Sequence, residues 1–359
     1  MVTVRCRQCC PLAWILVFVF CCVLVQKHLH RVVTVEPRAS VFHNDAPSNK
    51  VALDFKCTPT NSTIPSYLPK SHQEFLRYKH CRAFPTLLSP SPCEDDLYLL
   101  FVIKSTATQV ERRAALRETW AKAGYIQDRR IKVVFLVGRS LGHGGYNMQP
   151  LLEWENRHHN DILQWDFADS FFNLTLKEVG FLSWFSQSCK STHFVFKGDD
   201  DVFVNTENLI DFLRQHKPEN HLFTGDIMFA AWPIRNRAIK YFVPEDMYPN
   251  KMPYPPYAGG GGYLMSRQTV LGLGAVAQTI ELFPIDDVYV GMCLKKMGIR
   301  PIQHRGFLTF GFRNVFKHFD PCVYRDIMLV HKLNPGEMWA MWALIQDASL
   351  RCGKSRARL

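Results

Sequence analysis

Residues 194–204 read Phe-Val-Phe-Lys-Gly-Asp-Asp-Asp-Val-Phe-Val, so three consecutive carboxylates stand between two apolar runs. The first run predicts a buried strand, and the acids follow it directly. Carboxylates this close raise one another's pKa unless a cation lies between them. Alternation along an extended segment puts Asp199 and Asp201 on one side and Asp200 on the other. A divalent cation is the natural counter-charge, and a solvated turn or a helix N-cap is the alternative.

Outward from this strand, apolar runs and helical patterns alternate with short connections. Further strands are expected at 97–103, 131–137 and 162–167, and helices at 111–122, 151–159, 174–185, 208–215, 267–280, 287–297 and 337–346. Continuous apolar runs are typical of strands that are buried on both faces of a parallel sheet. We therefore predict an α/β fold of three layers with a mostly parallel central sheet, in which ligands bind at the carboxyl ends of the strands.

The rest of the chain divides by composition. The 359 residues carry a net charge of +11 and are 47% hydrophobic, which excludes a disordered chain. The basic charges are interleaved with acids, which disfavours nucleic acid as a partner. An uncharged apolar run at 9–25 predicts a membrane anchor, with a cleaved signal peptide as the alternative. We expect a cytoplasmic tail at 1–8, a Pro-dotted stem at 26–95, a catalytic body at 96–352 and a basic tail at 353–359.

Cysteines and glycosylation sequons indicate that the body is lumenal. The chain has 12 cysteines, of which seven follow the predicted anchor, and none of them forms a CxxC pair. Spread-out cysteines in a secretory chain predict disulfides rather than a zinc site. The pairs we expect are Cys81–Cys93, Cys189–Cys293 and Cys322–Cys352, with Cys57 left over. Two sequons predict glycosylation at Asn61 and Asn173.

The acidic cluster favours a diphosphate substrate. A cation that is held by few protein carboxylates keeps open positions for phosphate oxygens. The sequence contains no Walker A loop, and the glycines at 259–262 do not follow the GxGxxG pattern, so kinase and dinucleotide-dehydrogenase functions have no support. A sugar nucleotide remains as the common diphosphate substrate of a lumenal enzyme.

Several stretches together resemble the inverting β-1,3-glycosyltransferases of the Golgi, and within them the β-1,3-N-acetylglucosaminyltransferases. The similar stretches are 112–120, 134–138, 161–167 with 173–177, 196–205, 254–263 and 284–293. The resemblance covers about 97–352 and is closest to the members that extend core-1 O-glycans and poly-N-acetyllactosamine. It implies a GT-A fold, Mn²⁺ with Mg²⁺ as the alternative ion, and a type II protein of the Golgi membrane with a lumenal catalytic domain.

The resemblance also implies roles on the donor side. Asp201 and His331 would bind the metal ion, with a core histidine as the alternative for His331. Asp199 and Asp200 would lie near the ribose and the sugar of the donor. Three arginines would face the nucleotide and the pyrophosphate, with a solvated helix face as the alternative for each of them: Arg112, Arg113 and Arg117.

On the acceptor side, an inverting transfer needs one general base for the attacking hydroxyl. The resemblance favours Asp287 as this base and leaves Asp286 as a helix cap. Tyr254 and Tyr257 would lie beside the acceptor, and Trp232 and Tyr241 also carry rings that can stack on a sugar. Gly260 and Gly261 would let the backbone approach a sugar closely. For each aromatic residue, core packing is the alternative.

We therefore expect the transfer of GlcNAc from UDP-GlcNAc to the 3-hydroxyl of a terminal galactose on a glycan. The nearest alternative is a β-1,3-galactosyltransferase of the same fold, and an inactive lumenal glycan-binding protein is a more distant one. The expected partners are the donor, a galactose-terminated acceptor and the membrane through one N-terminal helix. Both a monomer and a homodimer remain open.

Overall fold

The computed structural model describes residues 57–140, 147–249, 252–312 and 318–353, which belong to one compact unit, Phe55–Leu359. Its helices are α2 (Lys70–Tyr78), α3 (Val110–Glu118), α4 (Gln149–His159), the 3-10 turn η2 (Phe171–Asn173), α5 (Leu174–Ser188), α6 (Thr206–Leu213), α7 (Arg267–Ala277), α8 (Asp286–Met297), α9 (Pro321–Asp326) and α10 (Pro335–Gln346). Its strands are β1 (Thr86–Leu88), β2 (Leu97–Lys104), β3 (Gly124–Ile126), β4 (Arg129–Arg139), β5 (Ile162–Ala168), β6 (Phe194–Asp199), β7 (Val202–Val204), β8 (Phe223–Met228), β9 (Tyr257–Ser266), β10 (Ile302–Gln303), β11 (Phe307–Leu308) and β12 (Leu329–His331).

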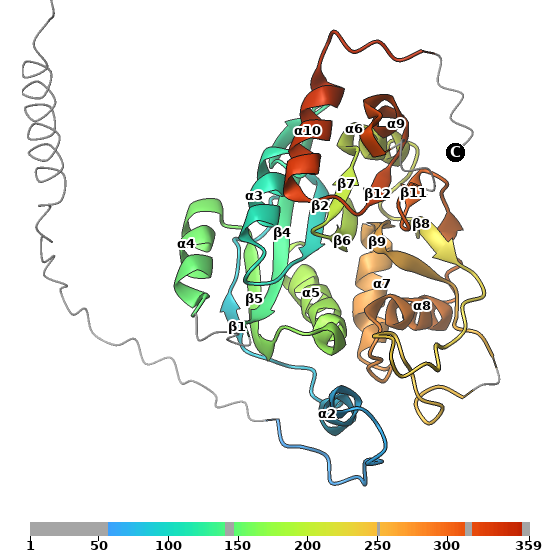
Figure 1. Cartoon of the computed structure of the whole chain (residues 1–359). Helices are drawn as coiled ribbons and strands as arrows, with labels where there is room; N and C mark the ends of the chain where they lie inside the picture. Colours follow the sequence, from blue (N-terminus) through green and yellow to red (C-terminus); the bar gives the residue numbers. More distant parts are fainter. Residues whose placement is uncertain (1–56, 141–146, 250–251, 313–317, 354–359) are drawn as a thin grey trace, which may run out of the picture. The chain divides into compact units, whose positions relative to one another are not determined.

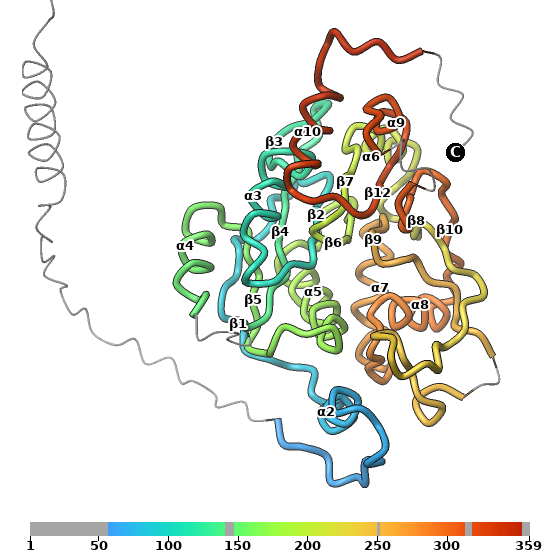
Figure 2. Tube along the Cα trace, viewed as in Figure 1, coloured from blue at the N-terminus to red at the C-terminus, as the bar shows by residue number. Residues whose placement is uncertain are grey.

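The main sheet has the strand order β1-β5-β4-β2-β6-β9-β8-β10, and β3 pairs with β4 (Figure 1 and Figure 2). Its centre, β5-β4-β2-β6, is parallel throughout. A second, three-stranded sheet has the order β11-β12-β7. The predicted mixed α/β fold with a mostly parallel centre is confirmed.

Both faces of the main sheet are covered, because successive side chains of β2 belong to two different cores. Leu100 and Val102 lie in a core with residues of α5, α7 and α8. Phe101 and Ile103 lie in a core with residues of α3, α6 and α10. This arrangement explains the unbroken apolar sequence of β2, which is buried along its whole length. The three predicted layers are therefore present.

The Gly-rich tract is a strand, which the sequence pattern did not predict. β9 lies between β6 and β8 and pairs antiparallel with both. At Gly262, φ is +155°, a conformation that L side chains rarely adopt, and an added Cβ would meet the Phe196 ring at 2.6 Å. The glycines thus allow β9 to lie close to β6 and to continue beyond its end.

The described part of the predicted stem packs on the body, although it was expected to be extended. α2 buries His72 and Phe75, and β1 adds an antiparallel edge to β5. Figure 2 follows this blue segment from α2 to β1. The compact unit therefore begins well before the predicted boundary at residue 96.

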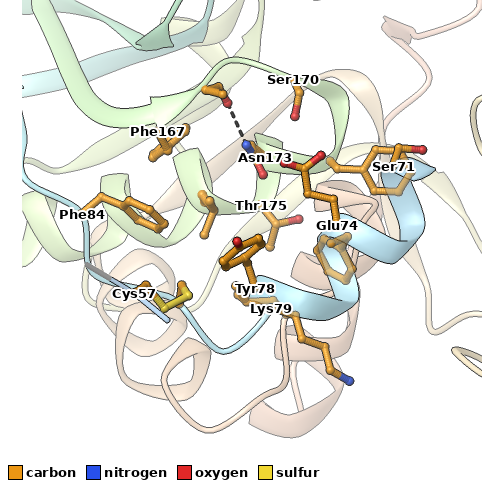
Figure 3. Close-up of a pocket in the computed structure, with 16 residues that line it drawn as sticks. Cys57, Ser71, Glu74, Tyr78, Lys79, Phe84, Phe167, Ser170, Asn173 and Thr175 are labelled. Atoms are coloured by element: carbon orange, nitrogen blue, oxygen red, sulfur yellow. Dashed lines mark hydrogen bonds between the residues drawn. A yellow bond between two sulfur atoms is a disulfide. The ribbon is translucent and has the colours of Figure 1, made fainter. Parts of the chain in front are cut away.

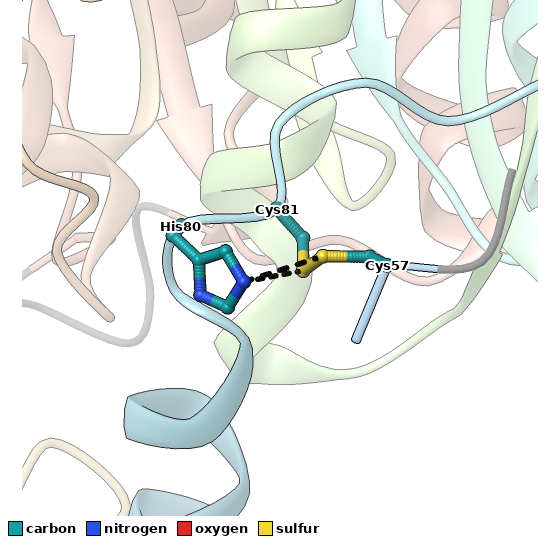
Figure 4. A group of neighbouring side chains, drawn as sticks. All are labelled: Cys57, His80 and Cys81. Carbon is teal, nitrogen blue, oxygen red and sulfur yellow. Dashed lines mark hydrogen bonds between the residues drawn. A yellow bond between two sulfur atoms is a disulfide. The ribbon is translucent and has the colours of Figure 1, made fainter. Parts of the chain in front are cut away.

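The disulfides correct two of the three predicted pairings. Cys322–Cys352 is confirmed, whereas the other bonds are Cys57–Cys81 and Cys93–Cys189. Cys93 reaches Cys189 because its amide donates to the Ser188 carbonyl at the end of α5. The thiol of Cys293 is free and buried in α8. In Figure 4 the His80 imidazole lies beside both sulfurs of the Cys57–Cys81 bond.

The predicted anchor at 9–25 lies outside the described residues. In the part of the chain that the structure describes, no helix combines the length and the apolar character needed to cross a membrane.

Candidate active site

Strand pairing brings the acidic triplet to a histidine that follows it by 130 residues. β7 begins directly after Asp201 and pairs antiparallel with β12, so that Val202 lies opposite His331. The His331 Nε2 atom is 2.9 Å from Asp201 Oδ1 and 4.0 Å from Asp199 Oδ2. Asp200 points elsewhere and accepts a hydrogen bond from Arg112 at 2.9 Å. The predicted alternation of the three acids is confirmed.

Asp199, Asp201 and His331 form a group of side chains that fits a divalent cation. Their ligand atoms all lie within 4.8 Å of one another. The His331 Nδ1 atom is 3.0 Å from the Thr309 carbonyl oxygen, which can only accept a hydrogen bond. Nδ1 therefore carries a proton, which leaves Nε2 available as a metal ligand. Two carboxylates and one imidazole suit Mn²⁺ or Mg²⁺ and leave further coordination positions open.

Asp201 and His331 shift one another's pKa values within this group. Burial opposes the charged form of Asp201, but the hydrogen bond and the charge of His331 lower its pKa. Burial likewise opposes a charged His331, but Asp201 and Asp199 raise the pKa of the imidazole. A proton on Nε2 and a metal ion are therefore alternatives at the same nitrogen.

Lys104 connects the triplet to the acids of α8. It ends β2 and pairs in register with Asp199 of β6. Its buried Nζ atom lies 3.0 Å from Asp199 Oδ1, 2.9 Å from Asp286 Oδ2 and 4.0 Å from Asp287 Oδ1. Burial alone would lower the pKa of Lys104, but the three carboxylates raise it well above its ordinary value. One fixed positive charge thus holds three acids from two elements.

The two acids of α8 have opposite properties. Burial opposes the ionisation of Asp286, but the Lys104 charge lowers its pKa. Burial and the Asp286 charge raise the pKa of Asp287 to about 8. The Asp287 Oδ1 atom is buried and accepts no hydrogen bond from any described residue. Two acids whose pKa values are pushed apart are typical of an acid–base site, and Asp287 has the properties of its base.

The predicted capping role of Asp286 is wrong. The N-cap of α8 is Ile285, and no side chain caps this helix end. The carboxylate of Asp286 binds Lys104 instead.

These groups open into a cleft of about 670 Å³. Asp199, Asp287, Gly260 and the tyrosines Tyr254 and Tyr257 line it, together with Lys104, Phe171, Leu174, Met228, Trp232, Ile234, Lys240, Tyr241, Gly259, Ile285, Asp286, Thr309, Phe310, His331 and Lys332. A Cβ on Gly260 would lie 2.9 Å from Asp287 Oδ2, so this glycine lets the backbone pass beside the acid. A Cβ on Gly261 would face Leu329 and His331 instead.

Arg113 and Arg117 do not join the site, although both were predicted to face the donor. Arg113 is fully buried and pairs with Glu155 at 2.7 Å. Arg117 pairs with Glu155 and Asp161 at 2.9 and 2.8 Å. Arg113 connects α3 to α4 and to the β2–α3 connection, and Arg117 connects α3 to α4 and to Asp161 just before β5, so both roles are structural. Arg112 alone of the three contacts the acidic triplet.

The two sequons lie in different settings. Asn61 is exposed. Asn173 is half-buried and donates to the Ala168 carbonyl at 2.7 Å, and Thr175 of the same sequon is buried with its hydroxyl bound to the Phe283 carbonyl.

Comparison with known proteins identifies the class of protein to which this fold and cleft belong. The family model described as galactosyltransferase matches residues 111–305, and the chain belongs to this family.

The names of the individual relatives are more specific than the description of the family. N-acetyllactosaminide beta-1,3-N-acetylglucosaminyltransferase 4 from Homo sapiens is 50% identical over 298 residues, which cover 82% of this chain and 78% of the relative. UDP-GlcNAc:betaGal beta-1,3-N-acetylglucosaminyltransferase 7 from Rattus norvegicus is 49% identical over 290 residues, covering 78% and 72%. N-acetyllactosaminide beta-1,3-N-acetylglucosaminyltransferase 3 from Homo sapiens is 45% identical over 291 residues, covering 79% and 78%. The predicted resemblance to this group is confirmed.

Sequence reasoning missed Lys104 and the importance of Asp199 beside His331. A signal for Lys104 existed, because a charged residue that ends a buried strand of a parallel sheet lies at the edge where ligands bind. No local sequence signal indicated Thr309, because its role depends on a contact with His331 of β12.

Proposed function

We propose that this protein transfers GlcNAc from UDP-GlcNAc to the 3-hydroxyl of a terminal galactose on a glycan, with inversion at the anomeric carbon. The names of the relatives support the donor and the linkage. The observation that carries the proposal is the pair of sites in one cleft. A cluster that suits a cation lies beside Asp287, a half-buried carboxylate with a raised pKa.

The cation site would serve the donor. Asp199, Asp201 and His331 would hold Mn²⁺, or Mg²⁺, which when bound neutralises the charge on the diphosphate of the donor. Arg112 lies beside the cluster with a partly exposed guanidinium, and it would contact a phosphate oxygen. Asp200 would then orient Arg112 and would not bind the ion itself.

Asp287 would act as the general base. The galactose O3 forms a bond to the anomeric carbon of GlcNAc while the bond to the phosphate oxygen breaks, and that electron pair leaves with UDP. The O3 proton passes to Asp287, whose raised pKa makes it a stronger acceptor than an ordinary carboxylate. Lys104 would keep Asp286 ionised and fixed behind it.

The acceptor would occupy the aromatic part of the cleft. Tyr257 is half-buried there, and Tyr254 is buried, with the two rings in edge-to-face contact at 6.3 Å. Apolar ring faces suit the C–H faces of a galactose, and both tyrosines line the same cleft as Asp287, so the O3 hydroxyl of a galactose bound there would face this acid. We further propose a GT-A fold and an anchor at 9–25 that holds the protein in the Golgi membrane with its body in the lumen.

The test uses the purified full-length chain with Mn²⁺, UDP-GlcNAc or UDP-galactose, and N-acetyllactosamine as the acceptor. We expect a β-1,3-linked GlcNAc product and at least tenfold slower transfer from UDP-galactose. Asp287→Asn should bind UDP normally and lose about 10²- to 10⁴-fold in kcat. Faster transfer from UDP-galactose would favour the alternative galactosyltransferase. Near-normal transfer by Asp287→Asn would refute the base.

A further inference from the structure

One wall of the cleft is a long irregular segment that needs support from elsewhere. Residues 229–249, the first described part of the β8–β9 connection, contain no helix or strand beyond one bridge between Ile234 and Phe242. We call these residues the acceptor-wall loop. Four of its residues line the cleft: Trp232, Ile234, Lys240 and Tyr241. Fixing such a loop costs conformational entropy, so the contacts that anchor it decide how well the wall is ordered.

The acceptor-wall loop is buried at Phe242 and Val243, which directly follow the cleft residue Tyr241. Phe242 is 6% exposed, whereas Trp232 and Tyr241 are 55% and 41% exposed. His72 of α2 contacts Phe242. Its Nε2 atom is 2.8 Å from the Phe242 carbonyl oxygen, and its ring is 5.2 Å from the Phe242 ring. Because a carbonyl oxygen only accepts, Nε2 carries the proton and donates it.

A second path of contacts leads from α2 to the same wall. The His72 ring packs edge-on against Phe172 at 4.8 Å, and the neighbouring Phe171 packs edge-on against Tyr241 at 5.4 Å. Lys240 lies over the rings of both Phe171 and Tyr241. Tyr67, just before α2, donates a hydrogen bond to Asp246 of the loop. Residues 67–72 thus contact the loop at two separated points.

The packing of α2 on the body leaves a cavity. A cavity of about 410 Å³ lies between α2 and the body, and its lining includes Glu74 and Tyr78 from α2 and Phe167 and Asn173 from the body (Figure 3). An incompletely packed interface gains less dispersion energy, so single hydrogen bonds contribute a larger share of the free energy that holds α2 in place. The Cys57–Cys81 bond closes a loop around α2 by joining the residues before the helix to those after it, and both cysteines line this cavity.

We propose that His72 is a positioning residue for acceptor binding. It holds the Phe242 carbonyl and thereby fixes Lys240 and Tyr241 on the cleft wall. The donor side is built from Asp199 at the end of β6, Asp201 before β7, His331 of β12 and Arg112 of α3, none of which His72 touches in the described contacts. The kinetic consequence of this proposal rests on the proposed transfer reaction. Loss of the His72 contact weakens acceptor binding and leaves donor binding unchanged.

The test compares His72→Phe, which keeps an aromatic ring but loses the donor, with His72→Gln, which keeps an N–H donor. The full-length chain is used, and His216→Phe is the matched control, because His216 packs on Phe212 of α6, away from the cleft. We expect His72→Phe to raise the acceptor KM about five- to tenfold with the donor KM within about twofold, as expected for one lost buried hydrogen bond. His72→Gln should recover most of the loss, and His216→Phe should change neither KM.

Hydrogen exchange supplies a readout that needs no turnover. Peptides from 229–249 should exchange faster in His72→Phe, and peptides from α8 should not change. Tyr67→Phe, at an exposed position, should shift exchange and acceptor KM in the same direction even if His72→Phe folds poorly. Unchanged exchange in the loop, equal rises in both KM values, or no recovery in His72→Gln would overturn the proposal. A wild-type chain that transfers no GlcNAc would refute the proposed function instead, because the exchange experiment still tests His72.

Discussion

Gly260→Ala should separate catalysis from stability. The added Cβ would lie 2.9 Å from Asp287 Oδ2 and 3.8 Å from Asp199 Oδ2, where ordinary contact begins at 3.4 Å. Asp287 must therefore move by about 0.5 Å, because its carboxylate is the flexible end of the contact. Misplacement of a reacting group by about 1 Å can cost about 10²-fold in rate, so we expect kcat to fall about tenfold. The free energy of unfolding should change by less than about 1 kcal/mol.

Gly274→Ala is the matched control for this experiment. It lies in α7, and its Cβ would meet the Leu182 carbonyl oxygen at 3.6 Å, which is ordinary contact. A helical Gly→Ala change of this kind stabilises by about 0.5–1 kcal/mol. The assay is initial-rate transfer from UDP-GlcNAc, with UDP affinity and thermal unfolding measured on the same samples. A folded Gly260→Ala protein with wild-type kcat would show that Asp287, at its present position, does not take part in the reaction.

Three further predictions concern protonation and buried charge. The rate should rise with pH up to about 8 and then level off, because Asp287 must lose its proton to act as base and its pKa is raised to about 8; a flat profile measured from pH 5 to 9 would contradict this. Mn²⁺ affinity, measured by calorimetry, should weaken as pH falls, because the raised pKa of His331 lets protons compete for Nε2; affinity independent of pH would remove His331 from the ligand set. Arg113→Met should lower the free energy of unfolding by about 3–5 kcal/mol, because it leaves Glu155 buried with one partner fewer. The exposed pair Arg139–Asp166 is its control, with about 0–1 kcal/mol expected for Arg139→Met.

The parts of the fold that the sequence predicts are those with strong local patterns. The run at 97–103 is apolar without interruption because β2 is covered on both faces, and a helix at 151–159 is confirmed by α4 within two residues. β8 and β9 were not predicted, because glycine-rich and mixed segments lack a two-residue alternation. β9 is a strand because it pairs with β6, and β8 is a strand because it pairs with β9.

The site divides in the same way. The alternation of Asp199 and Asp201 was predictable from three adjacent residues, whereas the choice among Arg112, Arg113 and Arg117 was not. These three lie on one helix with similar local sequence, and only the buried partner Glu155 from α4 separates their roles. The predicted disulfide partners of Cys93 and Cys189 were wrong for the same reason, because a backbone contact between distant segments brings these two cysteines together.

The central claim is that Asp199, Asp201 and His331 hold a divalent cation through which the donor diphosphate binds. Calorimetric titration of UDP into the full-length chain, with and without Mn²⁺, tests it most directly. The account predicts that UDP binding is at least tenfold tighter with Mn²⁺ and that Asp201→Asn removes this difference. Equal UDP affinity in both conditions, or an undiminished effect of Mn²⁺ in Asp201→Asn, would contradict it.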